Sequence, residues 1–197
     1  MPEAERVFDV LFSFIFIVVC TPLLCVALLL AAIGVGFPPV YVSRRVGRYG
    51  VPFRHVKIRT MRAGRALGRA YFEEARVTRL GRLLRRYHVD ELPELFLILN
   101  GTLSLVGPRP LPALFLAKFD CRTRERVRPG WTGLAQIKLL RRGILLGPEQ
   151  IRLDNIYAAR KSLGYNLRIL AATCRAFRRR RPPVADLRYN EYRRNFL

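Results

Sequence analysis

The chain has 197 residues, enough for one domain of moderate size with an appendage, and 51% of them are hydrophobic. Lys and Arg number 36 against 14 Asp and Glu, so the formal net charge is +22. This charge indicates an anionic partner, either nucleic acid, an anionic membrane surface or a phosphorylated substrate. The four cysteines lack CxxC or metal-finger spacing and there are only two histidines, which argues against a zinc site and indicates a reduced, cytosol-facing domain.

The N-terminal segment is apolar enough to enter a membrane. Residues 10–43 contain no charged side chain, whereas about 20 apolar residues suffice for a membrane helix. Acidic residues flank its start, unlike a signal peptide. Because Thr21-Pro22 interrupts the segment, a kinked span and a re-entrant hairpin are both allowed, and the residues alone slightly favour the span. Nearly all basic residues follow the segment, which predicts a cytoplasmic C-terminal domain.

Residues 38–61 are typical of a loop followed by a small β-hairpin. Gly47 and Gly50 bracket a turn, and the residues that follow alternate like an edge strand. On such a strand Lys57 and Arg59 share one face, where a solvated basic surface is the simplest interpretation. Residues 62–75 are rich in Ala, Gly and Arg and are expected to form a mobile connection.

Two adjacent carboxylates, Asp90 and Glu91, lie at the centre of the most informative stretch. Apolar residues recur at helical spacing on both sides of them. We therefore expect the pair at the junction of two short helices, with Asp90 as N-cap and Pro93 in the first turn. Helix capping explains this placement on its own, and chemistry is the alternative. The expected packed faces are Leu80, Leu83, Leu84 and Tyr87 in the first helix and Leu92, Leu95, Phe96 and Leu99 in the second.

Two turn-rich loops and a helical region follow. Two prolines and a glycine hold Arg109 in a stiff loop, which suits bidentate capture of a phosphate, although a surface turn explains it equally well. Residues 128–137 form the second loop, whose Trp131 is expected to anchor it in the core or at a membrane interface. Residues 151–177 show helical patterns, which include Ile169, Leu170, Thr173 and Phe177.

In order and spacing, these stretches resemble the bacterial sugar transferase family of membrane-bound polyprenyl-phosphate glycosyl-1-phosphate transferases. The resemblance extends from about residue 5 to about residue 175, and its specificity lies in the ordered set of motifs. The motifs are the apolar helix with Pro22, Arg45-Val-Gly, Phe53-Arg-His-Val-Lys-Ile-Arg-Thr-Met, Thr78-Arg-Leu-Gly-Arg-Leu-Leu-Arg, Asp90-Glu-Leu-Pro, Ser104-Leu-Val-Gly-Pro-Arg-Pro and Arg128-Pro-Gly-Trp-Thr-Gly-Leu-Ala-Gln.

The resemblance implies an enzyme that moves a sugar-1-phosphate from a nucleotide diphosphate sugar, here a UDP-sugar, to polyprenyl (undecaprenyl) phosphate. Such a reaction initiates the assembly of a surface polysaccharide or glycoconjugate. By the same resemblance, Asp90 is the nucleophile that forms a covalent aspartyl-phosphosugar intermediate, and Glu91 is a ligand of Mg²⁺. The implied phosphate-binding residues are Lys57, Arg85 and Arg109, with Arg59 and Arg128 as further candidates.

The resemblance also implies a compact α+β fold with amphipathic helices against the bilayer. Short members of the family use the proline-broken helix, here with Thr21-Pro22 at the kink, as a re-entrant hairpin, and this overrides the preference for a span. Residues 1–43 are then a membrane-embedded hairpin, and residues 44–197 a transferase domain on the cytoplasmic face of the bacterial inner membrane. The expected partners are the nucleotide sugar, polyprenyl phosphate and membrane lipids, not nucleic acid, and the oligomeric state is open.

Two alternatives to an active enzyme stay open. One is a catalytically inactive, membrane-tethered basic module that binds anionic lipid or nucleic acid, although no helix-turn-helix or RNA-binding motif accompanies the charge. The other is a degenerate transferase that keeps the fold as a scaffold. The chain departs from the family pattern at His88-Val89, where Ser-Leu is usual, and His88 is either a local hydrogen-bonding group or an added acid or base.

Overall fold

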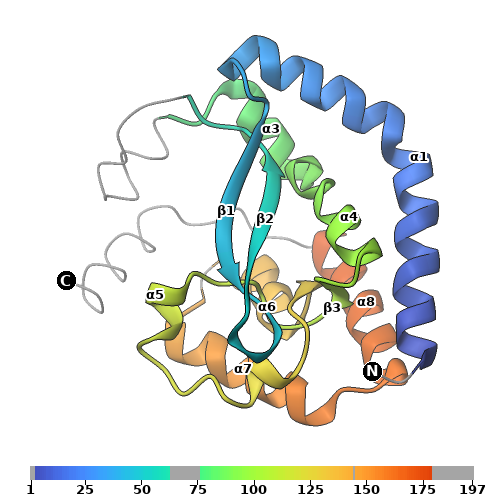
Figure 1. Cartoon of the computed structure of the whole chain (residues 1–197), viewed down its shortest axis with the longest axis vertical. Helices are drawn as coiled ribbons and strands as arrows, with labels where there is room; N and C mark the ends of the chain where they lie inside the picture. The colour runs from blue at the N-terminus through green and yellow to red at the C-terminus, as the bar shows by residue number, and fades with distance from the viewer. Residues whose placement is uncertain (1–2, 63–75, 144, 179–197) are drawn as a thin grey trace. The chain divides into compact units, whose positions relative to one another are not determined.

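Figure 1 shows the computed structural model, which describes residues 3–62, 76–143 and 145–178. Helices dominate the described chain, and two small two-stranded sheets accompany them, which confirms the predicted α+β class with a β-hairpin. Most of the predicted mobile connection, residues 63–75, lies outside the described residues. In chain order the elements are α1 (Glu3–Val35), β1 (Val40–Val46), η1 (Arg48–Gly50), β2 (Pro52–Ile58), α3 (Arg79–Tyr87), η2 (Val89–Glu91), α4 (Glu94–Leu99), β3 (Ser104–Val106), α5 (Ala113–Leu116), η3 (Arg124–Arg126), β4 (Gly130–Thr132), α6 (Leu134–Arg142), α7 (Gly147–Arg160) and α8 (Leu163–Arg178), where η denotes a 3₁₀ turn.

The chain divides into two compact units, each assembled from segments far apart in the sequence. Of the described residues, one unit contains 3–11, 44–53 and 97–178, and we call it the Arg109 unit. The other contains 12–43, 54–62 and 76–96, and we call it the Asp90 unit. The predicted division at residues 43 and 44 stays a prediction, because a membrane boundary is not defined by contacts within the chain.

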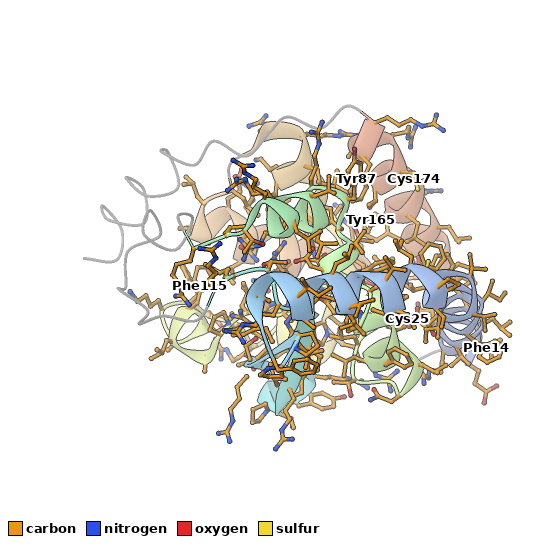
Figure 2. The ribbon with its side chains drawn as sticks, turned by 90° about the horizontal axis from the view of Figure 1, so that it is seen from above. Phe14, Cys25, Tyr87, Phe115, Tyr165 and Cys174 are labelled. Atoms are coloured by element: carbon orange, nitrogen blue, oxygen red, sulfur yellow. The ribbon has the colours of Figure 1, made fainter. Side chains whose placement is uncertain are left out.

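Helix α1 is long and apolar, with Pro22 inside it, and its ribbon changes direction part-way along (Figure 1). It is the one helix of the described chain with the length and composition to cross a membrane. The hydroxyl of Thr21 donates a hydrogen bond to the carbonyl of Ile17 at 2.7 Å, a contact that tends to bend helices. Most of the helix is not covered by protein, and Phe14 and Cys25, both labelled in Figure 2, are exposed.

The predicted hairpin is confirmed. Strands β1 and β2 pair in one sheet, and η1 joins them between Gly47 and Gly50. Gly50 has a φ of 76°, in the left-handed region that favours glycine. At Gly47 a Cβ would lie 2.9 Å from the carbonyl oxygen of Val51, so the turn leaves no room for a side chain there.

The Asp90 unit has a small apolar core in which Ala27 and Ala31 of α1 meet Ile58 of β2 and Leu84 of α3. Helix α3 begins at Arg79 because the hydroxyl of Thr78 accepts a hydrogen bond from the backbone N–H of Gly81 at 2.9 Å. Only glycine fits at position 81, since a Cβ there would lie 2.2 Å from the carbonyl oxygen of Thr60. The start of α3 therefore packs closely against the backbone at Thr60, two residues after strand β2 ends.

The two predicted helices around the acid pair exist, but their packed faces are partly wrong. In α3, Leu84 is buried, whereas Leu83 and Tyr87 are 52% and 64% exposed. Tyr87 is labelled in Figure 2. Around α4, Leu92 and Leu95 are buried as predicted, whereas Phe96 is 48% exposed. Apolar spacing therefore predicted the helices and not which side the protein core covers.

In the Arg109 unit, β3 and β4 form a parallel pair in the register Ser104 to Gly130 and Val106 to Thr132. A Cβ on Gly130 would lie 1.9 Å from the backbone nitrogen of Gly107, so this approach requires glycine. The stretch 128–137, predicted as a loop, instead contains β4 and the start of α6. Trp131 lies within β4 and is partly buried.

Helices α7 and α8 complete the Arg109 unit. The buried Tyr157 of α7 places its hydroxyl 2.8 Å from the carbonyl oxygen of Val106 and 2.9 Å from the side-chain oxygen of Asn166 in α8. The helix predicted in this region is confirmed, and the buried residues of α8 are Asn166, Ile169, Thr173 and Ala176, whereas Phe177 is 39% exposed.

Candidate functional site

The acid pair lies in a short 3₁₀ turn, η2, between α3 and α4. Helix α3 ends because His88 adopts a left-handed conformation, with φ of 56°. Asp90 then follows inside η2, and α4 begins only at Glu94, directly after Pro93. The prediction that Asp90 is the N-cap of the second helix is therefore wrong, because the left-handed residue and the 3₁₀ turn separate it from that helix.

Asp90 is a buried carboxylate, 8% exposed. Burial raises the pKa of Asp90 above its ordinary value, and the adjacent charge of Glu91 raises it further. The cationic groups of Lys57, His88 and Arg85 act in the opposite direction. Within the described residues no hydrogen bond contributes to the pKa of this carboxylate, so its oxygens are not committed to a structural contact.

A network of ionisable groups surrounds Glu91. The Lys57 ammonium is paired with one oxygen of Glu91 and lies 3.2 Å from Glu94 Oε1. The second oxygen of Glu91 lies 3.2 Å from His88 Nδ1. On the far side, His55 Nε2 is 3.1 Å from the same Glu94 oxygen that faces Lys57. Two histidines, one lysine and two glutamates therefore form one continuous series of contacts. One of its members, Glu91, directly follows Asp90 in the sequence.

The other two basic candidates of this unit contact the backbone or a hydroxyl. Arg85 donates from Nε to the hydroxyl of Thr60 at 2.8 Å and is otherwise exposed. Arg59 follows the end of β2 and donates to the carbonyl of Met61 at 3.2 Å, with weaker contacts to the carbonyls of Phe37 and Pro38 at 3.5 Å. Arg59 and Lys57 thus take different partners, and only Lys57 joins the acidic cluster.

Arg109 and Arg128 belong to the Arg109 unit. Arg109 lies in a non-helical loop, as predicted, and is partly buried. Its carbonyl accepts a hydrogen bond from Arg124 Nη2 at 2.7 Å. Arg128 is half-buried just before β4, and burial together with the charges of Arg6 and Arg48 lowers the pKa of its guanidinium. A cation in such surroundings favours an anionic partner.

A known protein family matches nearly the whole chain. The model of the family described as bacterial sugar transferase matches residues 2–180 of the chain. The chain belongs to the bacterial sugar transferase family.

Three curated relatives show the breadth of the match. This sugar transferase is 37% identical over 175 residues to the uncharacterized sugar transferase EpsL of Bacillus subtilis, covering 87% of this chain and 85% of that protein. It is 36% identical over 180 residues to a UDP-glucose:undecaprenyl-phosphate glucose-1-phosphate transferase of Caulobacter vibrioides, covering 86% and 67%. It is 31% identical over 196 residues to an undecaprenyl-phosphate galactose phosphotransferase of Salmonella typhimurium, covering 89% of this chain but 40% of that protein.

The acidic cluster of this sugar transferase was only partly predictable. Sequence reasoning selected Lys57 and Glu91 but missed His55 and Glu94, which hold Lys57 from the other side. A signal was present, because residues 55 and 57 point to the same face of a strand and Glu91 and Glu94 are three residues apart. The sequence alone did not indicate that this strand face meets that turn.

Proposed function

We propose that this sugar transferase moves a sugar-1-phosphate from a UDP-sugar to undecaprenyl phosphate, and thereby initiates assembly of a surface glycan. Relatives whose names state a donor are described as using UDP-glucose or UDP-N-acetylgalactosamine, with undecaprenyl phosphate as acceptor. The observation that carries the proposal is Asp90, a buried carboxylate with a raised pKa that accepts no hydrogen bond from the described part of the chain, next in sequence to a cluster that contains Lys57.

In the proposed reaction a carboxylate oxygen of Asp90 attacks the β-phosphorus of the donor. The bond from that phosphorus to the bridging oxygen breaks, and UMP leaves with the electron pair. The product is an aspartyl-phosphosugar. An oxygen of undecaprenyl phosphate then attacks the same phosphorus, the acyl phosphate bond breaks, and Asp90 returns as a carboxylate. The lipid leaves as undecaprenyl diphosphate sugar, so one difficult transfer is divided into two displacements.

The basic residues supply charge complementary to the phosphates. Lys57 is held between Glu91 and Glu94, so its ammonium has a fixed position rather than a mobile one. A fixed cation needs little reorganisation when negative charge develops on a transferring phosphoryl group. Arg85 and Arg109 are proposed to bind phosphate oxygens, and Arg59 and Arg128 are proposed in supporting roles.

The acidic residues fit a magnesium ion that arrives with the donor. Within the described residues no group of three or more His, Cys, Asp or Glu side chains is arranged to hold a metal by itself. Mg²⁺ commonly takes one or two protein carboxylates and completes its shell with substrate phosphates and water. We propose Glu91 as that ligand, and its carboxylate then exchanges part of its contact with Lys57 for the ion. When bound, the ion neutralises diphosphate charge and favours departure of UMP.

We further propose that α1 enters and leaves the bilayer on the cytoplasmic face. Its first residues are bound by the Arg109 unit, with Asp9 accepting a hydrogen bond from Ser104 at 2.7 Å and Glu5 paired with Lys161 at 2.6 Å. Residues 44–53, which follow the helix in sequence, belong to the same unit. The chain leaves this unit along the helix and returns to it at residue 44, after the helix has ended, which supports a re-entrant hairpin with its kink at Thr21 and Pro22. The excess of basic residues after the helix favours the cytoplasmic side of the inner membrane.

The deciding experiment measures release of UMP by detergent-solubilised protein with Mg²⁺ and undecaprenyl phosphate, across a panel of UDP-sugars. We expect release with one sugar, loss of release on chelation, and loss of release in Asp90→Asn, which preserves the shape of the side chain. With the wild-type protein and donor alone, a phosphosugar should become covalently attached, and mass spectrometry should place it on Asp90. Full activity of Asp90→Asn would exclude the nucleophile, and donor binding without turnover in the wild type would favour a degenerate scaffold.

A further inference from the structure

A buried ion pair lies in the Arg109 unit, apart from the acidic cluster described above. Arg124 of η3 donates from Nε to Asp154 of α7 at 3.1 Å, and the two side chains are 3% and 2% exposed. The proposed reaction assigns no role to either residue. Besides its bond to Asp154, Arg124 contacts the peptide carbonyl of Arg109.

The ion pair contacts the backbone of Arg109. Arg124 uses Nη2 to donate to the Arg109 carbonyl at 2.7 Å, while its Nε binds Asp154. The backbone of Arg109 also acts on Asp154, whose pKa it lowers. Both members of one ion pair thus interact with the backbone of one residue, and the bond from Arg124 fixes the peptide that carries the Arg109 carbonyl.

The neighbouring peptides are fixed as well. The carbonyl of Pro108 accepts from the backbone N–H of Gly130 at 2.8 Å, and the carbonyl of Leu111 accepts from that of Val46 at 3.0 Å. Pro108 and Leu111 are buried, whereas Arg109 between them is only partly buried. Within the described residues no side-chain hydrogen bond of the Arg109 guanidinium is found. A rigid backbone therefore presents a guanidinium that is left for another partner.

The energetics favour a geometric role over a stabilising one. A buried ion pair contributes little net stability compared with apolar side chains of similar volume, because both charges lose their hydration. Burial raises the pKa of Asp154 to about 6 against the opposing charge of Arg124, so loss of hydration outweighs the attraction of its partner. The ion pair therefore contributes little to the stability of the core, but it can fix the orientation of the loop that contains Arg109.

We propose that Arg124 and Asp154 are positioning residues that orient Arg109 for the donor diphosphate. The inference rests on the proposed function, in which Arg109 binds phosphate. Bidentate binding of a phosphate by a guanidinium depends on the direction of the side chain as well as on its charge. If the loop rotates at Arg109, the guanidinium keeps its charge but no longer points toward the phosphate. Small errors in the position of such a group lower the catalytic rate strongly.

The test is a double-mutant cycle between Asp154→Asn and Arg109→Ala, with initial rates of UMP release at several donor concentrations. In the wild-type background Asp154→Asn should lower kcat/KM for the donor by about tenfold or more. In the Arg109→Ala background the same change should have an effect of less than about twofold, because the group that the pair orients is absent. Arg124→Lys keeps the charge but not both hydrogen bonds. Its kcat/KM should lie between that of the wild type and that of Asp154→Asn.

Two further variants separate orientation from folding. The double change Arg124→Met with Asp154→Leu removes both charges together, and it should keep the thermal transition while losing the same factor in kcat/KM. Asp120→Asn is the matched control, because Asp120 and Arg122 form an exposed ion pair at 2.8 Å in the same unit, and its rates should equal those of the wild type.

The outcomes are distinct. An equal loss from Asp154→Asn in both backgrounds overturns the positioning role and leaves the role of Arg109 intact. A wild-type rate for Arg109→Ala overturns the positioning role together with the phosphate-binding role of Arg109. Neither result touches the nucleophile, since loss of the phosphosugar adduct in Asp90→Asn tests that step separately.

Discussion

Asp90 and Asp154 are both buried aspartates with raised pKa values, and we propose different uses for them. For Asp90 the causes are burial and the neighbouring charge of Glu91, which the charges of Lys57, His88 and Arg85 oppose, and no hydrogen bond to its carboxylate is found among the residues that the structure describes. For Asp154 burial is opposed by the charge and hydrogen bond of Arg124 and by the backbone of Arg109. The first carboxylate has oxygens available for attack on phosphorus, whereas those of the second are engaged in orientation.

The raised pKa of Asp154 predicts a pH dependence of stability. Its folded pKa of about 6 lies above the ordinary 3.8, so the folded state holds this proton more tightly than the unfolded state. Its contribution to stability is therefore present at low pH and is lost as pH rises through about 6. Compared with wild type, Asp154→Asn should gain in thermal transition temperature between pH 4 and pH 6, with no further change above. If the transition temperature of Asp154→Asn instead fell relative to wild type between pH 4 and pH 6, the ion pair would be shown to lower the pKa of Asp154.

At the scale of single residues, the sequence predicted those functional candidates whose adjacent residues form a recognisable local pattern. Asp90 and Glu91 stand together, and Arg109 stands between two prolines. It missed Glu94 and Arg124, since their importance arises from partners brought close by the fold. An isolated Glu or Arg is usually a solvated side chain, so no local pattern separates these two from the many others.

Among the elements, α3 depends on a single close contact. Gly81 faces the carbonyl of Thr60, and the hydroxyl of the same threonine accepts the hydrogen bond of Arg85. The position of the helix and the position of that arginine are thus set by one residue of the preceding strand segment. A change at the contact affects both.

Gly81→Ala should therefore destabilise the protein. The added Cβ would lie 2.2 Å from a backbone oxygen, which cannot move aside as a flexible side chain can. We expect a loss of about 1–3 kcal/mol in the free energy of unfolding, seen as a lower thermal transition temperature. Gly164→Ala in α8 is the control, because nothing lies within 4 Å of its Cβ, and helix propensity should then stabilise by up to about 1 kcal/mol. Equal transition temperatures for the two variants would contradict the packing argument.

Sequence periodicity predicted α3, α4 and α8, and it misjudged which sides of α3 and α4 are covered. Leu83, Tyr87 and Phe96 fit the apolar pattern and are nevertheless about half exposed or more. An apolar side chain that faces a bilayer has the same helical spacing as one that faces a protein core. For a protein of this class, apolar periodicity therefore predicts that a helix forms. It does not distinguish a face that meets the bilayer from a face that meets the protein core.

For the whole molecule, the two compact units are interleaved along the sequence. Residues 3–11 before the membrane segment and 44–53 after it belong to the same unit. No pattern in the sequence links these two segments to each other or to residues 97–178. Glu5 and Asp9 appeared only as charges at the edge of an apolar run, and their partners lie far along the chain.

A re-entrant helix predicts that both flanks of α1 are reached from the cytoplasm. In a variant with the four native cysteines replaced, a single cysteine at Glu3 or at Arg54, both exposed, should react with a membrane-impermeant maleimide in inverted vesicles and not in spheroplasts. Labelling in lysed membranes controls for reactivity. Opposite sidedness of the two positions would establish a span and contradict the proposed hairpin.

The contacts of Asp9 also bear on how the protein is made. The ribosome completes the apolar helix before it reaches Ser104, 95 residues after Asp9, and later still Lys161, the partner of Glu5. During synthesis the acids at the start of the helix must stay hydrated while the segment behind them meets lipid. Their hydration opposes transfer of the N-terminal end across the bilayer until the late partners arrive and secure it. Biogenesis and final topology would then depend on the same two carboxylates.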